Sequence, residues 1–245
     1  MKSLVIQNLA KHFGGVAAVS GVSMEVPAGK VTGLIGPNGA GKTTLINLIT
    51  GVLTVSEGTI RFGDRDITQE SAHKVARAGI TRTFQNIRLL AEASVVDNVM
   101  IGFYRNEKAS TLASLMGLPS ARRETADLRE RTRELLVRFG MEKYAEHEAG
   151  SLAYGHQRRV EMMRALASKP SLILLDEPVA GMNDVEANEL GEIFRGLAKD
   201  GMGVLLIEHN IRFVTNLCDY VYVLDSGRMI ASGTLTTWSL SLIHI

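Results

Sequence analysis

The sequence has little cysteine, little net charge and no long apolar run. Cys218 is the only cysteine in 245 residues, which excludes an internal disulfide framework and a cysteine-rich zinc site. It lies in an apolar stretch, which favours a buried structural thiol over a reactive one. Lys and Arg total 27 against 26 Asp and Glu, so nothing indicates a strongly basic surface for nucleic acid. No segment approaches the roughly 18 apolar residues of a membrane span, and residues 1–15 lack a signal-peptide core, so we expect a cytoplasmic protein.

What is present is a globular composition with a repeated alternation of strand and helix. Hydrophobic residues make up 45% of the chain and charged residues 22%, which excludes wholesale disorder. Strand-like and helical segments alternate at both ends, and this order predicts a largely parallel α/β core. The expected strands are Leu4–Leu9, Val22–Val26, Lys30–Ile35, Gly58–Phe62, Ile80–Phe84, Leu172–Leu175 and Val204–Ile207, with a closing hairpin of Tyr220–Leu224 and Met229–Ala231.

The middle and the end of the chain differ from this core. Strand patterns vanish between about Asn86 and Ser168, where Arg122–Phe139 is charged with helical spacing of its apolar residues. Asn106–Ser120 is small and polar, which indicates a surface loop or insertion. The tail from Leu235 to Ile245 has neither a helix pattern nor an acidic residue, and we expect residues 234–245 to be an atypical, non-native end.

A glycine-rich loop carries the clearest chemical signal. Residues 36–43 read GPNGAGKT between an expected strand and an expected helix, the context in which this motif binds phosphate. Its glycines allow successive backbone N–H groups to point into one nest, Lys42 would reach the β- and γ-phosphates, and the Thr43 hydroxyl would ligate Mg²⁺. The alternative, a glycine turn that happens to carry Lys-Thr, is disfavoured by that context. The predicted nucleotide contacts are Gly36, Pro37, Asn38, Gly39, Ala40, Gly41, Lys42, Thr43 and Thr44.

Two acids follow the apolar run Leu172–Leu175. Ligands bind at the carboxyl edge of parallel sheets, so Asp176 is placed to hold Mg²⁺ through water. Glu177 points the other way and is placed to accept a proton from an attacking water. A solvated acidic pair that caps the next helix is the alternative, and it would be favoured if no phosphate loop were present.

Two further polar side chains follow expected strands. Val204–Ile207 ends in Glu208-His209, and a histidine there could donate to the γ-phosphate and help position water. Gln85 follows Arg82-Thr83-Phe84 and could touch Mg²⁺. Alone, each would be an ordinary surface or core residue.

Together these residues resemble the ATP-binding subunit of ABC transporters. The segment LAYGHQRR, residues 152–159, stands where that family carries its LSGGQ signature, and the motifs occur in the family's order over residues 1–233. The resemblance implies a P-loop NTPase core of the RecA type, with an N-terminal antiparallel β subdomain and a helical insert. It implies one domain, with residues 1–85 and 166–233 as the catalytic core and residues 86–165 as the helical subdomain.

The resemblance also implies roles and partners. Phe13 would stack on adenine, Gln85 would be the Q-loop residue, residues 180–183 the D-loop and His209 the switch histidine. Catalysis would rest on Glu177, His209 and Gln85. Two subunits would pair head to tail, and the signature of one would complete the ATP site of the other. The metal ligands would be Thr43, Gln85 and Asp176; the residues acting on the second subunit's ATP would be Ala153, Tyr154, Gly155 and His156.

The resemblance places the chain at the cytoplasmic face of the inner membrane as a peripheral subunit. Its expected partners are two membrane permeases, a second ATP-binding subunit and, indirectly, an external solute-binding protein, without nucleic acid. The forms LAYG…QRR and TRTFQNIRLL are similar to the LivG-type branched-chain amino acid importer subunit, which makes Ala153 and Tyr154 expected and leaves His156 as the odd residue. The alternatives are a soluble ABC protein acting on nucleic acid, a non-hydrolysing regulator and a P-loop GTPase, although the guanine-reading Asn-Lys-x-Asp is absent.

Overall fold

The chain divides into two compact units. The structure is a computed structural model, and it describes residues 1–83, 87–103 and 119–234, with side chains omitted for 119–122 and 124. The first unit combines residues 1–82 with the chain from Ser171 onward, and the second spans Thr83–Pro170. The predicted loop of residues 106–120 falls largely outside the described residues, as does nearly all of the predicted atypical tail.

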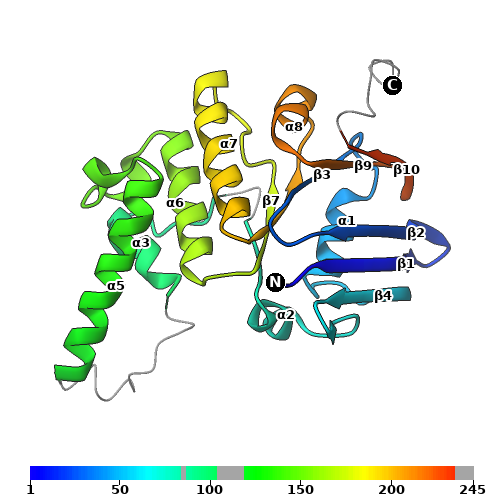
Figure 1. Cartoon of the computed structure of the whole chain (residues 1–245), viewed down its shortest axis with the longest axis horizontal. Helices are drawn as coiled ribbons and strands as arrows, with labels where there is room; N and C mark the ends of the chain where they lie inside the picture. Colours follow the sequence, from blue (N-terminus) through cyan, green and yellow to red (C-terminus); the bar gives the residue numbers. More distant parts are fainter. Residues whose placement is uncertain (84–86, 104–118, 235–245) are drawn as a thin grey trace. The chain divides into compact units, whose positions relative to one another are not determined.

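The first unit begins with an antiparallel sheet whose strand order is β2-β1-β4-β5 (Figure 1). Its buried residues recur at alternating positions along much of β1 and β2, as expected for strands with one face in the core. The short helix α2, Ala72–Ala78, follows this sheet and leads to β6. The strands are β1 Leu4–Phe13, β2 Val16–Val26, β4 Glu57–Phe62 and β5 Arg65–Asp66.

A second, largely parallel sheet has the strand order β10-β9-β3-β8-β7-β6. Only the β9–β10 pair in it is antiparallel. Every residue of β7 and β8 is buried, which explains why both read as unbroken apolar runs. The strands are β3 Val31–Ile35, β6 Ile80–Arg82, β7 Leu172–Asp176, β8 Gly203–Ile207, β9 Tyr220–Asp225 and β10 Arg228–Gly233.

Three helices accompany this sheet. These are α1 Lys42–Ile49, α7 Asp184–Lys199 and α8 Ile211–Leu217. One buried apolar cluster joins α1 to both sheets; it includes Leu45 and Ile46 of α1, Ile6 of β1 and Leu34 of β3. The helix that follows the glycine-rich loop is therefore anchored in the centre of the first unit.

The second unit contains helices, and its described residues include no β-strand beyond the isolated bridge between Ser94 and Glu148. Helix α3 packs closely on α6, because a Cβ on Gly102 would lie 2.1 Å from the carbonyl oxygen of Arg164. Across the described parts of both units, no helix combines the length and apolar character needed to cross a membrane. The helices are α3 Val95–Ile101, α5 Pro119–Arg138 and α6 Tyr154–Ala167, with the 3-10 turns η2 Glu142–Tyr144 and η3 Ala149–Ser151.

The predicted α/β class is confirmed, together with the strands that define it, but the boundaries needed correction. The loop predicted to reach Ser120 ends earlier, because Pro119 and Ser120 already belong to α5. Proline suits the first turn of a helix, where its missing N–H costs nothing. Cys218 is buried as expected, and burial raises the pKa of its thiol to about 12. The sequence analysis missed β5, α2, α3 and α8, all of which are short.

Candidate nucleotide site

Four neighbouring parallel strands of the first unit end in polar or glycine-rich segments. Strand β3 leads into the glycine-rich loop, β8 into Glu208-His209 and β6 ends at Arg82, while β7 ends at Asp176. The strand ends are level, since Leu34 of β3 and Asp176 of β7 both pair with Ile207 of β8. The predicted phosphate loop, the two acids and the histidine therefore meet at one edge of the sheet.

The glycines of the loop are required by close backbone contacts. A Cβ on Gly36 would lie 2.0 Å from the carbonyl oxygen of Leu224, and a Cβ on Gly41 would lie 2.6 Å from that of Ala18. Gly39 and Gly41 also have φ values of +82° and +100°, in the left-handed region that favours glycine. The loop is tied to the β9–β10 turn because the N–H of Gly227 donates to the carbonyl of Ala40. Its shape is thus fixed by the fold around it.

Lys42 closes the loop on itself. Its Nζ donates to the carbonyl oxygens of Gly36 and Pro37, at 2.6 and 2.9 Å. These are neutral acceptors, so an anionic phosphate would be a stronger partner for the same ammonium group. Lys42 begins α1 directly after the left-handed Gly41, and Thr43 is exposed in the first helical turn. The cation and the hydroxyl therefore stand where N–H groups of the helix start are also available.

Asp176 is held by a cation that the sequence analysis did not assign. Its Oδ2 accepts from Nη2 of Arg82 at 2.8 Å, and both side chains are only about a tenth exposed. Nη1 of Arg82 donates to Oδ1 of Asn47 in α1, at 2.6 Å. The carboxylate at the end of β7 is thereby connected to the helix of the phosphate loop.

Glu177 and His209 face each other across the ends of β7 and β8. Nδ1 of His209 lies 3.8 Å from Oε1 of Glu177 and 3.8 Å from Oε2 of Glu208. Glu177 has a φ of +48°, and its N–H donates to the carbonyl of Ile207 at 2.9 Å. This left-handed residue changes the direction of the backbone directly after Asp176. His209 remains two-thirds exposed, so its ring is accessible to a ligand.

Glu208 lies beneath this pair as a buried carboxylate. It accepts from the backbone N–H groups of Val179 and His209, both at 3.2 Å. Burial raises the pKa of Glu208, and the hydrogen bonds and nearby His209 only partly oppose that effect. Glu208 thus links the turn after Glu177 to the turn that carries His209.

Phe13 ends β1 at the tip of the β1–β2 hairpin, where it pairs with Val16. Its ring is about half exposed, and Nζ of Lys11 lies 5.2 Å from the ring centroid. The loop reaches this hairpin too, through the approach of Gly41 to Ala18. An exposed aromatic ring near the phosphate loop is compatible with stacking on a base.

The signature segment lies in the second unit, at the start of α6. Ala153 is the N-cap and provides no side-chain cap, while Tyr154 is about half exposed in the first turn. His156 does not point freely outward, because its Nε2 lies 3.1 Å from Oη of Tyr144 and the two rings are 4.6 Å apart. The next residues are structural: Arg158 pairs with Glu161 at 2.9 Å, and Arg159 donates to the carbonyl of Phe139.

The donor set suits a magnesium ion shared with a nucleotide. In the described residues, no group of three His, Cys, Asp or Glu side chains could hold a metal alone. A hydroxyl and a carboxylate, from Thr43 and Asp176, are hard oxygen donors of the kind Mg²⁺ prefers when phosphates complete its shell. Gln85, the third predicted ligand, lies outside the described residues.

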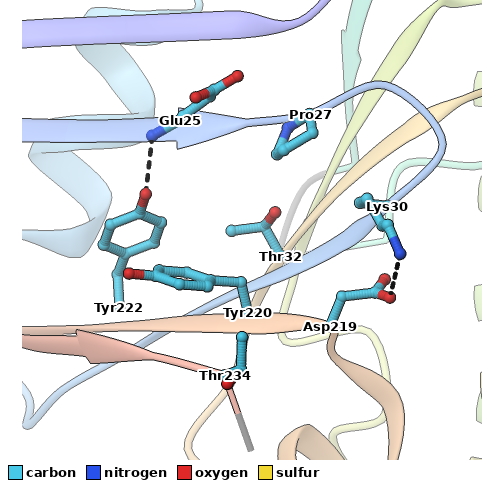
Figure 2. Close-up of a pocket in the computed structure, with 8 residues that line it drawn as sticks. All are labelled: Glu25, Pro27, Lys30, Thr32, Asp219, Tyr220, Tyr222 and Thr234. Carbon is cyan, nitrogen blue, oxygen red and sulfur yellow. Dashed lines mark hydrogen bonds and ion pairs between the residues drawn. The ribbon is translucent and has the colours of Figure 1, made fainter.

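A separate pocket of about 490 Å³ lies at the other end of β3 (Figure 2). Thr32 stands near the start of β3, whereas the phosphate loop begins where β3 ends. Tyr222 accepts from the N–H of Glu25 at 3.0 Å, and Lys30 pairs with Asp219 at 2.9 Å across the pocket. This pocket contributes none of the predicted nucleotide contacts.

Comparison with known proteins identifies the family. The family model described as "ABC transporter" matches residues 19–180. The chain belongs to the ABC transporter ATP-binding family. It is 38% identical to the high-affinity branched-chain amino acid transport ATP-binding protein BraF of Pseudomonas aeruginosa, over 94% of this chain and 91% of the relative. LivG of Escherichia coli, which bears the same description, is 37% identical over the same shares.

Other members of the family are almost as similar. The lipopolysaccharide export system ATP-binding protein LptB of Escherichia coli is 36% identical, over 96% of this chain and 92% of the relative. The crystal structure of the ADP conformation of MJ1267, an ATP-binding cassette of an ABC transporter, superposes with a TM-score of 0.83 at 37% identity. That comparison covers 96% of this chain and 91% of MJ1267, and it supports the P-loop NTPase fold class.

Sequence reasoning missed three residues at this edge. Arg82 contacts Asp176 because β6 pairs with β7, and it also contacts Asn47 of α1; the sequence analysis assigned no role to either residue or to Glu208. Only their position in the sequence could have indicated a role: Arg82 lies in a predicted strand just before Gln85, and Glu208 directly precedes His209.

Proposed function

We propose that this chain binds ATP with Mg²⁺ and hydrolyses it as the ATP-binding subunit of an importer for branched-chain or related amino acids. The observation that carries the proposal is the shared strand edge: the phosphate loop, Asp176-Glu177 and His209 follow three adjacent parallel strands. A solvated acidic pair or a chance glycine turn would not account for this alignment.

Lys42 supplies the first step, which is phosphate binding. Its ammonium exchanges the carbonyls of Gly36 and Pro37 for the β- and γ-phosphates, while the N–H groups of the loop hold the remaining oxygens. The exposed ring of Phe13 would stack on the base. Thr43 and Asp176, with Gln85, would hold Mg²⁺, which when bound neutralises charge on the phosphates.

Glu177 and His209 act on the attacking water. Glu177 accepts its proton as general base, and its side chain is three-quarters buried, which limits competition from solvent. His209, 3.8 Å away, donates to the γ-phosphate and keeps the water between the two groups. Glu208 holds both turns in place through its bonds to the backbone of Val179 and His209.

The signature residues serve a second subunit. The helix α6 starts at Tyr154 and presents its N-terminal N–H groups, which favour an anion. Ala153, Tyr154, Gly155 and His156 would therefore complete the ATP site of a partner paired head to tail. Residues 1–233 then form one ATPase domain whose helical part, residues 86–165, contacts two membrane permeases at the cytoplasmic face of the inner membrane.

The proposed amino acid substrate rests on the similarity to BraF and LivG, which are ATP-binding proteins of branched-chain amino acid transport. LptB, the ATP-binding protein of a lipopolysaccharide export system, is 36% identical and supplies the competing cargo. Uptake of labelled leucine by cells that carry the gene with its neighbouring permease genes tests this part. Export of lipopolysaccharide without amino acid uptake would contradict it.

The decisive test of hydrolysis is Glu177→Gln. We expect ATP binding to stay within about twofold and turnover to fall by roughly 10²-fold or more, because the proton acceptor is removed. Glu189→Gln, on the exposed surface of α7, is the matched control and should leave turnover unchanged. Hydrolysis by Glu177→Gln at the parental rate would show that Glu177 is not the base.

Light scattering on Glu177→Gln tests the paired site. A shift from monomer to dimer only with Mg-ATP is expected if the signature of one copy completes the site of another. A monomer that binds ATP but never pairs with itself, and pairs only with a sister subunit, would replace the homodimer by a heterodimer.

A further inference from the structure

Arg82 connects the end of β7 with the helix of the phosphate loop. Its guanidinium donates to Asp176 through Nη2 at 2.8 Å and to Asn47 through Nη1 at 2.6 Å. The side chains of Arg82 and Asp176 are 12% and 11% exposed, so water competes little for either group. This is an anchored, desolvated pair, unlike the exposed ion pairs elsewhere on the chain, such as Lys30–Asp219.

The geometry restricts how the Asp176 carboxylate can turn. The planar fork of arginine holds two acceptors in a fixed relation, which the single ammonium of lysine does not reproduce. One acceptor, Asn47, belongs to α1, the helix that begins at Lys42. The other belongs to β7, the strand beside β6. Arg82 therefore fixes the orientation of the Asp176 carboxylate relative to α1, the helix that follows the phosphate loop.

We propose that Arg82 is a positioning residue for magnesium-dependent nucleotide binding. Its hydrogen bond to Oδ2 holds the Asp176 carboxylate in one orientation, in which the carboxylate would help to hold the metal of the bound nucleotide. The inference rests on the proposed function, in which Asp176 holds Mg²⁺, and adds to it the residues Arg82 and Asn47.

Charge alone would act in the opposite direction. A guanidinium beside Asp176 repels Mg²⁺, so an arginine that only neutralised the buried carboxylate would weaken metal binding, and its removal would strengthen it. Positioning predicts the reverse, because an unheld carboxylate loses its preferred orientation. The sign of the effect therefore separates the two roles.

The experiment measures the affinity of a fluorescent ADP analogue in excess Mg²⁺ and in EDTA. The magnesium gain is the dissociation constant in EDTA divided by the dissociation constant in Mg²⁺, so a large value means that Mg²⁺ tightens nucleotide binding. Arg82→Gln should leave the affinity in EDTA within about twofold and lower the magnesium gain about tenfold, equivalent to roughly 1.4 kcal/mol. An unchanged or larger gain would overturn the proposal, even if the melting temperature falls.

Conservative variants sharpen the result. Arg82→Lys keeps the charge but reaches one acceptor, so we expect a melting temperature near that of the parent with the magnesium gain still reduced. Asn47→Ala should lower the gain about threefold, and should have no further effect in the Arg82→Gln background, because both act through one network. Full recovery of the gain by Arg82→Lys, or additive effects of the two changes, would exclude a two-point anchor.

Asp176→Asn distinguishes failure of this inference from failure of the proposed function. If Asp176→Asn keeps the parental magnesium gain, Asp176 does not hold the metal and the proposed site fails, taking the inference with it. If Asp176→Asn loses the gain but Arg82→Gln keeps it, the proposed site stands and only the role of Arg82 is wrong.

Discussion

The strand edge of the first unit and the helix start of the second unit are built in different ways. At the strand edge, close contacts fix the positions: Gly36 and Gly41 have no room for a side chain, and Asp176 is held by Arg82, which also donates to Asn47 of α1. At the start of α6, Ala153 offers no cap, whereas α7 begins with a complete capping box at Asn183. Several contacts fix the first region, whereas in the second no side chain of the N-cap residue caps the N–H groups of the first turn.

This difference suits the two proposed tasks. A site that must hold a phosphate chain benefits from a shape that exists before the ligand arrives, because little ordering remains to oppose binding. A helix start that meets another subunit's phosphate needs N–H groups without an internal acceptor. Changes at the strand edge should therefore have large effects, and changes at the helix start small ones.

The largest effect is expected from Gly41→Ala. The new Cβ would lie 2.6 Å from the carbonyl oxygen of Ala18, and the alanine backbone would have to keep the φ of +100° that Gly41 has. We expect a loss of about 2 kcal/mol or more in the free energy of unfolding, together with loss of nucleotide binding. Urea unfolding and nucleotide titration measure the two. Gly15→Ala is the control, since nothing lies within 4 Å of its Cβ; equal losses in both variants would contradict a special role for the loop.

Lys42→Ala should affect the ligand more than the fold. It removes two hydrogen bonds to loop carbonyls but also the only assigned cation for the β- and γ-phosphates. Charge-assisted bonds contribute about 1.5–3 kcal/mol, so we expect about 10- to 100-fold weaker nucleotide binding with a melting temperature near that of the parent. Lys30→Ala, at the other end of β3, is the matched control. Parental nucleotide affinity in Lys42→Ala would remove Lys42 from the site.

Glu208→Gln tests the buried carboxylate through pH. Burial raises the pKa of Glu208, so the fold prefers its protonated form. The stability that this preference contributes is complete below the ordinary pKa of about 4.3 and is lost as pH rises through the higher folded value. Of the neighbouring groups, protonated His209 opposes the shift, as do the N–H groups of Val179, His209 and Asn210.

The Glu208→Gln variant should not show this loss of folding stability as pH rises. Urea unfolding at a series of pH values should show the parent losing stability relative to Glu208→Gln as pH rises across that window. Glu189→Gln, whose carboxylate is exposed, should follow the parent. Parallel pH profiles for parent and Glu208→Gln would mean that Glu208 ionises in the fold at no cost.

The same contrast explains what the sequence could predict. The phosphate loop was predictable because its glycines specify backbone conformations locally, and Asp176 because an apolar run of strand length ends at it. The contact of Arg82 with Asp176 was not, since it depends on β6 pairing with β7, and the contact of Arg82 with Asn47 depends on where α1 packs; no local pattern encodes either. The short helices α2, α3 and α8 span fewer than three turns, too few for a helical period to stand out. Tyr144 as the neighbour of His156 also follows only from the tertiary fold.

Ala153→Ser should have the smallest effect and probes the open helix start directly. A serine oxygen at the N-cap could accept from the N–H of Gly155, since the N–H of His156 already donates to the carbonyl of residue 153, and such caps contribute about 1 kcal/mol. We expect the melting temperature to rise, while turnover changes by less than about threefold, since the N–H groups that meet the second subunit's phosphate stay in place. Ala153→Val, which adds no acceptor, should not raise the melting temperature. A large gain in turnover without a gain in stability would instead mean that the serine hydroxyl itself contacts the nucleotide, and that the backbone of α6 alone is an incomplete phosphate site.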